Sequence, residues 1–407
     1  MLFSIDFLNF DKLSAIIFLI LMSIFLYLKR KNLDLQPIIK IGTIPIMYVL
    51  LLRTKIGLKL MDSIAKNFRG LVKLFGYIAI GVGYLGMILT SAMMVFSVVL
   101  LFTKPEIENG AALLLPFTNI PGLGYLSFWH FIISILIIAT IHEFAHGVVA
   151  RAYDIKVKNS GVGALSLLIP FIPLAFVEPD EEEMKTKNAT AQLSVFAAGP
   201  FINIVLSIII AIFIATVVTP FDDKILEYDG FSYKIINESY PSAISGMTDS
   251  TLVSLNGEPI EHFTIFQDKM KSIKANEKIT IGTKDGNYSL ITTSSPNNAS
   301  LGFIGIQPIE NNVFVKEEYK KYSTSYFWLR GLLKWLFNLN LLVGLFNLLP
   351  LLVVDGGRMF QITVKKVFKK KKTSDFIIKI MALFLGSIIL GMLMWTYVPK
   401  LIGLFGF

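Results

Sequence analysis

The sequence contains no cysteine, few histidines and few charged residues. The absence of cysteine among 407 residues excludes disulfides, thiolate metal sites and a cysteine nucleophile. Only 16% of the residues are charged and 54% are hydrophobic, which is too apolar for a typical water-soluble protein. With only four histidines, any metal site must draw on a small set of His, Asp and Glu side chains. The composition therefore indicates a membrane protein.

Long apolar runs recur along the chain. About 20 apolar residues are needed to cross the hydrocarbon core of a bilayer. The stretches that meet this requirement are 9–28, 74–102, 126–149, 190–218, 327–349 and 376–396. We therefore predict a polytopic α-helical membrane protein with about six transmembrane helices. Two shorter apolar segments, 44–52 and 162–177, contain prolines and are predicted to be re-entrant or interfacial.

Basic residues flank the predicted spans unevenly. Segment 29–73 carries ten lysines and arginines, whereas the loop after the second span offers Lys104 beside acidic residues. Because positive charge is retained in the cytosol, 29–73 is predicted to be cytosolic and both termini extracytoplasmic. The lysines at 365, 366 and 369–372 then also face the cytosol. The net charge of +9 is therefore expected to serve topology and contacts with anionic lipid rather than nucleic acid.

A stretch of soluble composition, 220–325, separates the fourth and fifth spans. It is rich in Asn, Ser, Thr, Lys and Glu and includes the turn pairs Asn256-Gly257 and Asp285-Gly286. We expect a small β-rich extracytoplasmic domain here, because the orientation places this loop outside. The predicted divisions of the chain are 1–125 with two spans and the basic segment, 126–219 with two core spans, 220–325, and 326–407 with the last two spans.

The end of the third predicted span holds His142, Glu143 and His146. Residues four apart lie on one face of a helix, about 6 Å apart along its axis, so both imidazoles can reach one metal ion. Two histidines with this spacing around a glutamate are the signature of zinc metalloproteases, in which the carboxylate accepts a proton from the attacking water. Two buried, hydrogen-bonded structural histidines are the alternative. Such a polar cluster within a membrane span is costly, however, unless it serves a function.

A third metal ligand must come from elsewhere in the chain, because a catalytic zinc ion usually takes three protein ligands and a water. His130 lies 12 residues before His142, roughly 18 Å along a helix, and His262 belongs to the predicted external domain. We therefore expect a carboxylate, and Asp355 is the best intramembrane candidate. Pro350 and the two glycines after Asp355 allow the chain to leave regular helix geometry there.

Three separated motifs resemble the site-2 protease family of intramembrane zinc metalloproteases. They are His142-Glu143-x-x-His146, Gly199-Pro200-Phe201-Ile202-Asn203 and Asn347-x-x-Pro350-x-x-x-x-Asp355-Gly356, in the family's order. Segment 177–183 also resembles an archaeal branch of that family, and a solvated acidic helix start is the alternative. The resemblance implies a three-helix catalytic core in which His142, His146 and Asp355 bind one zinc ion. Glu143 would then be the general base.

The same resemblance implies roles for two asparagines. Asn347 is expected near the substrate or the developing oxyanion. Asn203 is a second candidate for that role, and packing between helices through its amide is the alternative.

The predicted external domain resembles a circularly permuted PDZ domain. The matching segments are 240–247, 252–260 and 302–306. PDZ domains bind peptide ends by adding a strand to a sheet edge, so the resemblance implies a peptide end or a substrate ectodomain as a partner. A spacer without a ligand is the alternative.

These features together predict an intramembrane zinc metalloprotease that hydrolyses peptide bonds in or near transmembrane segments of other membrane proteins. His142 lies roughly 10 Å from the cytosolic end of its span, so cleavage is expected near the cytosolic side of the cell membrane. A substrate helix must unwind first, and segment 162–177 is a candidate for holding it extended at a strand edge. Two alternatives stay open from the sequence: a metal transporter that uses the same cluster, and a membrane scaffold that bears a PDZ domain.

Overall fold

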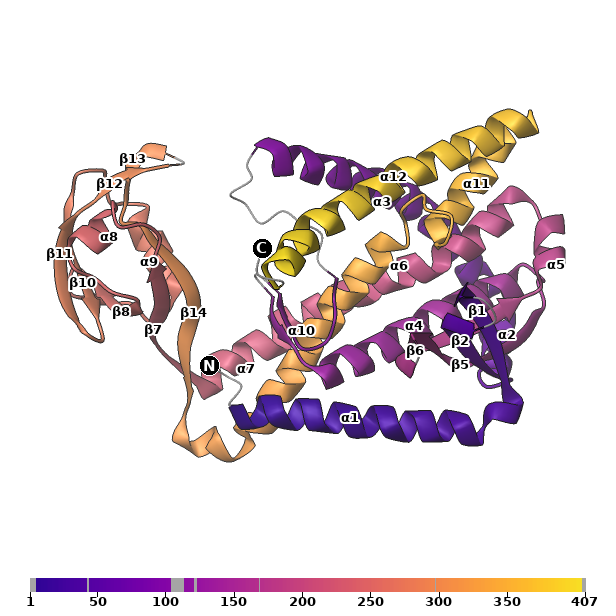
Figure 1. The fold of residues 1–407 in the computed structure, drawn as a ribbon, viewed down its shortest axis with the longest axis horizontal. Coiled ribbons are helices and arrows are strands. Elements are labelled where there is room, and N and C mark those ends of the chain that lie inside the picture. The colour runs from indigo at the N-terminus through magenta and orange to yellow at the C-terminus, as the bar shows by residue number, and fades with distance from the viewer. Residues whose placement is uncertain are drawn as a thin grey trace. The chain divides into compact units, whose positions relative to one another are not determined.

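The structure is a computed structural model that describes residues 5–41, 44–103, 113–120, 123–167, 169–296 and 298–404. Lys104, the topology marker after the second span, lies outside these residues. The chain divides into two compact units, one formed by Met1–Phe213 with Arg330–Phe407 and the other by Ile214–Leu329. The first unit is mostly helical and the second mostly β-structure (Figure 1).

Long apolar helices make up most of the first unit. Its helices are α1 (Ile5–Leu28), α2 (Leu58–Asn67), α3 (Arg69–Thr103), α4 (Phe128–Ala152), α5 (Glu181–Thr186), α6 (Ala189–Phe213), α10 (Ser323–Phe346, which starts in the second unit), α11 (Asp355–Val367) and α12 (Lys371–Leu404). Among the described residues, six helical segments are long and apolar enough to cross a membrane: Asn9–Leu28, Arg69–Thr103, Phe128–Ala152, Ala189–Ile225, Glu317–Phe346 and Lys371–Pro399. The predicted multi-span helical membrane protein is therefore confirmed.

Helix α4 is the central helix of the first unit. Half of its most apolar stretch is buried inside the protein, whereas only 11–22% of the corresponding stretch is buried in each of the other spans. It packs against α6, and α3 packs against both. Small side chains such as Ala145 of α4 and Ala198 of α6 allow this close approach. The polar face of α4 is thereby held in the protein interior rather than in lipid.

A four-stranded antiparallel sheet belongs to the same unit. Its order is β1 (Leu33–Ile41), β2 (Ile44–Thr54), β5 (Val157–Leu167) and β6 (Ile169–Pro179). A short hairpin, β3 (Thr118–Ile120) and β4 (Gly124–Leu126), precedes α4. Segments 44–52 and 162–177, which we predicted to be re-entrant or interfacial, form β2 and the β5–β6 hairpin. Prolines are tolerated in β6 because it lies at the edge of the sheet, beside α4 (Figure 1).

The second unit is β-rich, as predicted. The elements are a π-helical turn (Ile214–Val218), α7 (Thr219–Ile225), β7 (Leu226–Ile235), α8 (Pro241–Ile244), β8 (Ser250–Leu255), β9 (Glu258–Pro259), α9 (Phe263–Met270), β10 (Lys278–Thr283), β11 (Gly286–Ile291), β12 (Thr293–Ser295), β13 (Asn298–Phe303) and β14 (Ile306–Val315). The main sheet has the order β11-β10-β8-β7-β14, with β9 paired to β8 and a separate β12–β13 hairpin. Buried side chains including Phe231, Leu252 and Ile281 form its core.

Candidate active site

One face of α4 carries the candidate metal-binding residues. The ligand atoms of His142, Glu143 and His146 lie within 4.8 Å of one another. Ser127 caps the start of the helix by accepting from the His130 N–H at 3.2 Å, and the Phe128 N–H donates to Asp11 of α1 at 3.0 Å. The other two histidines make different contacts. His130 packs against Gly331 of α10, and the ring of His262 lies 5.6 Å from that of Tyr228 in the second unit.

Asp355 reaches both imidazoles from the first turn of α11. Its Oδ2 lies 3.1 Å from His142 Nε2 and 3.4 Å from His146 Nε2. The Asp355 side chain is 18% exposed and each imidazole 10%, so the three groups are largely shielded from solvent. Two imidazole nitrogens and one carboxylate oxygen, all converging on one point, are a ligand set that zinc prefers.

The turn between α10 and α11 aims Asp355 at this point. Helix α10 ends at Phe346, and the Gly356 N–H closes the turn by donating to the Asn347 carbonyl at 2.7 Å. A side chain at Gly356 or Gly357 would collide with the backbone of the turn, so both positions require glycine. The predicted departure from regular helix geometry is thus a tight, glycine-dependent turn.

Gly199 of α6 leaves the space that a metal ion needs. A methyl group on Gly199 would collide with Nε2 of both His142 and His146. Pro200 follows within the same helix and cannot donate a backbone hydrogen bond to the preceding turn. The hydrogen on Gly199 therefore faces the point where the two imidazoles and Asp355 converge. The residues present fit a zinc ion.

The far nitrogens of both histidines have partners on α6. His146 Nδ1 lies 2.6 Å from the Val195 carbonyl, to which it can donate. His142 Nδ1 lies 3.0 Å from the Asn203 amide, which is fully buried. The Asn203 Oδ1 has no hydrogen-bond partner among the described residues. Turning this amide by 180° pairs Oδ1 with a protonated Nδ1, which leaves Nε2 of His142 for a metal.

Glu143 points toward the sheet. Its Oε2 accepts a hydrogen bond from the Val177 N–H of β6 at 3.0 Å. Asp355, by contrast, places one oxygen against Nε2 of both histidines. The two carboxylates therefore occupy different positions: Asp355 lies with the imidazole nitrogens, and Glu143 lies between them and β6.

A cavity of about 860 Å³ opens beside these residues. Its α4 wall consists of Ile135, Ile138, Ala139, His142, Glu143 and His146, which share one helix face. Asn347 and Asp355 line it from the α10–α11 turn, and Val177 from β6. The apolar lining also includes Val343, whereas Lys158, Glu178, Glu181, Glu182 and Arg358 supply charged lining. The cavity is therefore a groove with both apolar and charged walls.

Glu178 is held by a polar ladder across the sheet, which consists of Asp34, Arg53, Glu178 and Asn159. The Arg53 Nε donates to Glu178 Oε1 at 2.9 Å, and its Nη1 donates to Asp34 at 2.7 Å. The Asn159 amide donates to Glu178 Oε2 at 2.9 Å. Partial burial acts to raise the pKa of Glu178, but the hydrogen bonds from Arg53 and Asn159 outweigh it and hold the pKa below its ordinary value. The ladder ties the edge strand β6 to β1 and β2.

The structure brings most of the predicted site residues together. Those at the convergence point or lining the cavity are His142, Glu143, His146, Asn347 and Asp355, while Asn203 lies behind His142. The sequence reasoning missed the Val177 N–H and the Val195 carbonyl. Both are backbone groups, so residue identity carries no signal for them. Pro170, Pro173 and Pro179 are the signal in the sequence that indicates an edge strand here, because proline is confined to edge strands within sheets.

Comparisons with known proteins agree with this geometry. A family model described as peptidase family M50 matches residues 130–390, well over half of the chain. An uncharacterized protein of Methanocaldococcus jannaschii is 28% identical over 362 residues, covering 85% of this chain and 87% of that protein. The matched family region contains all of the residues that converge on the cavity from α4, α6 and α11.

Proposed function

The chain belongs to peptidase family M50, the site-2 protease family of zinc metallopeptidases, and from this premise we propose that it cleaves peptide bonds in or near transmembrane segments of other membrane proteins. Zinc is its cofactor. The observation that carries the proposal is the convergence of His142, His146 and Asp355 beside Glu143 on a membrane-spanning helix. Membership of a peptidase family removes the support for a metal transporter and for a non-enzymatic scaffold.

In the proposed site, His142, His146 and Asp355 hold one zinc ion. When bound, zinc polarises the scissile carbonyl and makes water more acidic. Glu143 accepts the proton of the attacking water and passes it to the leaving amine nitrogen. This assignment is supported by the separation of the two carboxylates, because Glu143 is held toward β6 while Asp355 faces both imidazoles.

We assign different tasks to the two asparagines. Asn347 lines the cavity close to Asp355, where an amide N–H can stabilise negative charge that develops on the substrate oxygen. Asn203 is buried behind His142 and does not line the cavity, so it is proposed to orient the imidazole rather than to bind substrate. The Val195 carbonyl does the same for His146.

The substrate is proposed to bind as an extended strand at the free edge of β6. A transmembrane helix has its carbonyls engaged in hydrogen bonds, so it must unwind before attack. An edge strand offers replacement partners for the unwound backbone. Support comes from the position of β6, which lies at the sheet edge, packs against α4 and contributes Val177 to the cavity wall.

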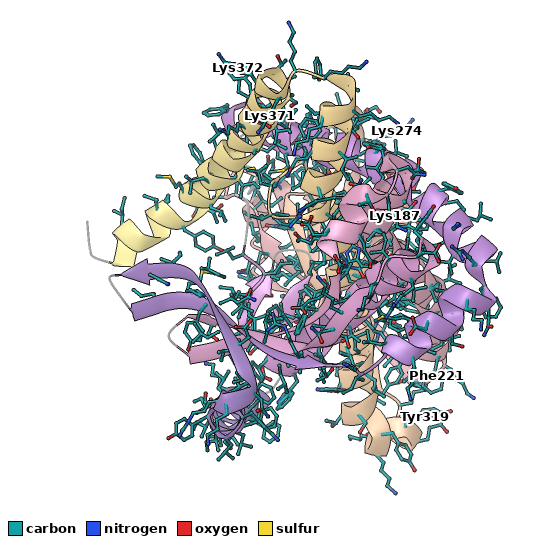
Figure 2. The ribbon with its side chains drawn as sticks, turned by 90° about the vertical axis from the view of Figure 1, so that its right-hand side faces the viewer. Lys187, Phe221, Lys274, Tyr319, Lys371 and Lys372 are labelled. Carbon is teal, nitrogen blue, oxygen red and sulfur yellow. The ribbon has the colours of Figure 1, made fainter. Side chains whose placement is uncertain are left out.

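The proposed topology places both termini and the second unit outside the cell membrane and the active site near the cytosolic side. It is based on the Lys and Arg bias of 29–73 and of 365–372. Figure 2 shows Lys371 and Lys372 at the start of α12, where both are exposed and suited to contact anionic lipid.

The second unit is proposed to act as a PDZ-like domain. A peptide end or the ectodomain of a substrate would pair with one of its sheet edges. The described part of the sheet has β14 and β11 at its two edges, which supports such pairing.

The test is digestion of a transmembrane substrate by the purified full chain in liposomes, with the products mapped by mass spectrometry. We expect cleavage within the membrane segment near its cytosolic end, loss of cleavage with a zinc chelator, and recovery on adding zinc. Cleavage that persists in the chelator, or that occurs only in soluble loops of the substrate, would contradict the proposal.

A further inference from the structure

The free edge of β6 has few hydrogen-bond donors. Among the described strands β6 pairs with β5 alone, and Ser160 faces Val177 while Val162 faces Ala175. In an antiparallel pair, alternate residues direct their backbone groups toward the partner strand and away from it. The Val177 N–H donates to Glu143, so it points away from β5. Positions two residues apart share this direction.

Proline occupies the neighbouring outward positions. Residues 173, 175, 177 and 179 share the outward direction, and Pro173 and Pro179 have no N–H. The outward donors on this part of the edge are therefore those of Ala175 and Val177. One of the two, Val177, is engaged by the Glu143 carboxylate.

The donor of Val177 cannot serve a second partner without cost. A single N–H forms one strong hydrogen bond. The loss of a buried donor costs more free energy when its acceptor is charged, as a carboxylate is, than when the acceptor is neutral. If a substrate strand took the Val177 N–H, Glu143 would lose the contact that holds it beside the imidazoles. Val177 is fixed in turn by its packing, because Gly147 of α4 has no side chain and lets Val177 approach the helix closely.

We infer that the free edge of β6 has two separate tasks: the Val177 N–H positions the Glu143 carboxylate for catalysis, and the Ala175 backbone pairs with the substrate. This inference rests on the proposed function, because it assumes an extended peptide substrate at β6. Pairing with Ala175 also sets the register of the substrate on β6. The substrate residue two positions beyond the one paired with Ala175 lies beside Val177, and the scissile bond is at this residue.

The dimensions of the groove agree with this register. The α4 residues that line it run from Ile135 to His146, roughly 16 Å along the helix. An extended strand of about five residues has this length. Ile172 of β6 and Ile135 of α4 pack against the same apolar cluster, and Val177 of β6 contacts Glu143, so β6 runs along α4 with Val177 at the metal-binding end. Substrate residues on the membrane side of the scissile bond then meet Ile135 and the apolar wall.

Proline substitutions test the two donors separately. Val177→Pro removes the N–H that faces Glu143, and Ala175→Pro removes the N–H assigned to the substrate, while neither donor belongs to the β5–β6 ladder. Val177→Ala and Ala175→Ser change the side chain but keep the backbone N–H, so they serve as the references against which the proline variants are compared. The zinc-loaded full chain is assayed on the transmembrane substrate for kcat and KM, and each variant is also analysed for bound zinc.

We expect Val177→Pro to lower kcat at least tenfold relative to Val177→Ala, with KM and zinc content unchanged, because the base is misplaced. Ala175→Pro should raise KM by about 2- to 12-fold relative to Ala175→Ser, with kcat little changed, because one substrate hydrogen bond is lost. Equal kcat for Val177→Pro and Val177→Ala, or equal KM for Ala175→Pro and Ala175→Ser, would overturn the corresponding assignment.

Amide hydrogen exchange keeps the inference testable if a proline variant does not fold. In Glu143→Ala, the Val177 amide should exchange faster than in the wild type, while the Ala175 amide should not change. In Glu143→Gln, a synthetic peptide with the sequence of the cleaved segment should slow exchange at Ala175. The opposite results would refute the assignment of donors. Absence of hydrolysis by the wild type would instead refute the proposed function, and exchange at Val177 would still decide the contact with Glu143.

Discussion

Replacing Asn203 with alanine should weaken zinc binding without changing any proposed zinc ligand. The Asn203 amide lies 3.0 Å from His142 Nδ1 and is fully buried, so in the wild type this contact is shielded from bulk solvent. Loss of such an orienting partner typically costs 10–100-fold in metal affinity. At 25 °C this corresponds to about 1.4–2.7 kcal/mol of binding free energy.

The measurement is a competition between the purified full chain and a chromophoric zinc chelator, from which the zinc Kd is obtained. Asn203→Asp provides the rescue, because its carboxylate can accept from the Nδ1–H of His142, and we expect its Kd to lie within about threefold of the wild type. Asn340→Ala is the matched control: Asn340 is also fully buried, but its amide donates at 2.7 Å to the Leu336 carbonyl of its own helix.

A zinc Kd for Asn203→Ala equal to that of the wild type would refute the orienting role. An equal loss of affinity in Asn340→Ala would refute it as well, since the effect would then follow from the loss of any buried amide. Thermal unfolding of the zinc-free variants shows whether either substitution destabilises the fold in general, apart from its effect on zinc binding.

Three further results are expected. Gly199→Ala should abolish zinc binding, because its methyl group would occupy the space between the two imidazoles, whereas Gly386→Ala in α12, where a Cβ meets nothing within 4 Å, should bind zinc normally in the same assay. Arg53→Met should lower the thermal unfolding midpoint at neutral pH. The pKa of Glu178 is lower in the folded state than its ordinary value of 4.5, so Arg53 stabilises the fold fully above pH 4.5 and this stabilisation is lost as the pH falls through the folded pKa. The unfolding midpoints of the wild type and the variant should therefore become equal in acid. A difference between the midpoints that does not depend on pH would contradict the proposed stabilisation of Glu178 by Arg53. A cysteine at Asn256, in a chain with no native cysteine, should react with an impermeant thiol reagent added outside; reaction only from the cytosolic side would reverse the proposed topology.

The membrane spans and the histidine cluster were predictable because their signals are local. An apolar run of sufficient length and two histidines four residues apart are both read within one stretch of chain. The approach of Asp355 was predicted by excluding His130 and His262, and the structure places its carboxylate against the imidazoles of the cluster.

The sheet beside α4 was not predictable in the same way. Strands β2 and β5 pair over more than a hundred residues of sequence, with Arg53 opposite Gly161, and no local pattern specifies such a partner. Short apolar segments with proline fit an interfacial segment as well as an edge strand. Asn203 illustrates a second limit. Its motif indicated proximity to the site, but only the packing of α6 on α4 shows that it faces the far nitrogen of His142 rather than the cavity.

His142, His146 and Asp355 are proposed to hold zinc while Glu143 moves the proton. The most direct test measures bound zinc and hydrolysis of the transmembrane substrate together in Glu143→Gln and Asp355→Ala. We predict that Glu143→Gln retains about one zinc ion per chain and loses at least about 100-fold in turnover, because the amide cannot accept the proton. Asp355→Ala should lose both zinc and hydrolysis. Hydrolysis by Glu143→Gln would contradict the role of Glu143 as the base, and full zinc content in Asp355→Ala would contradict the role of Asp355 as a ligand.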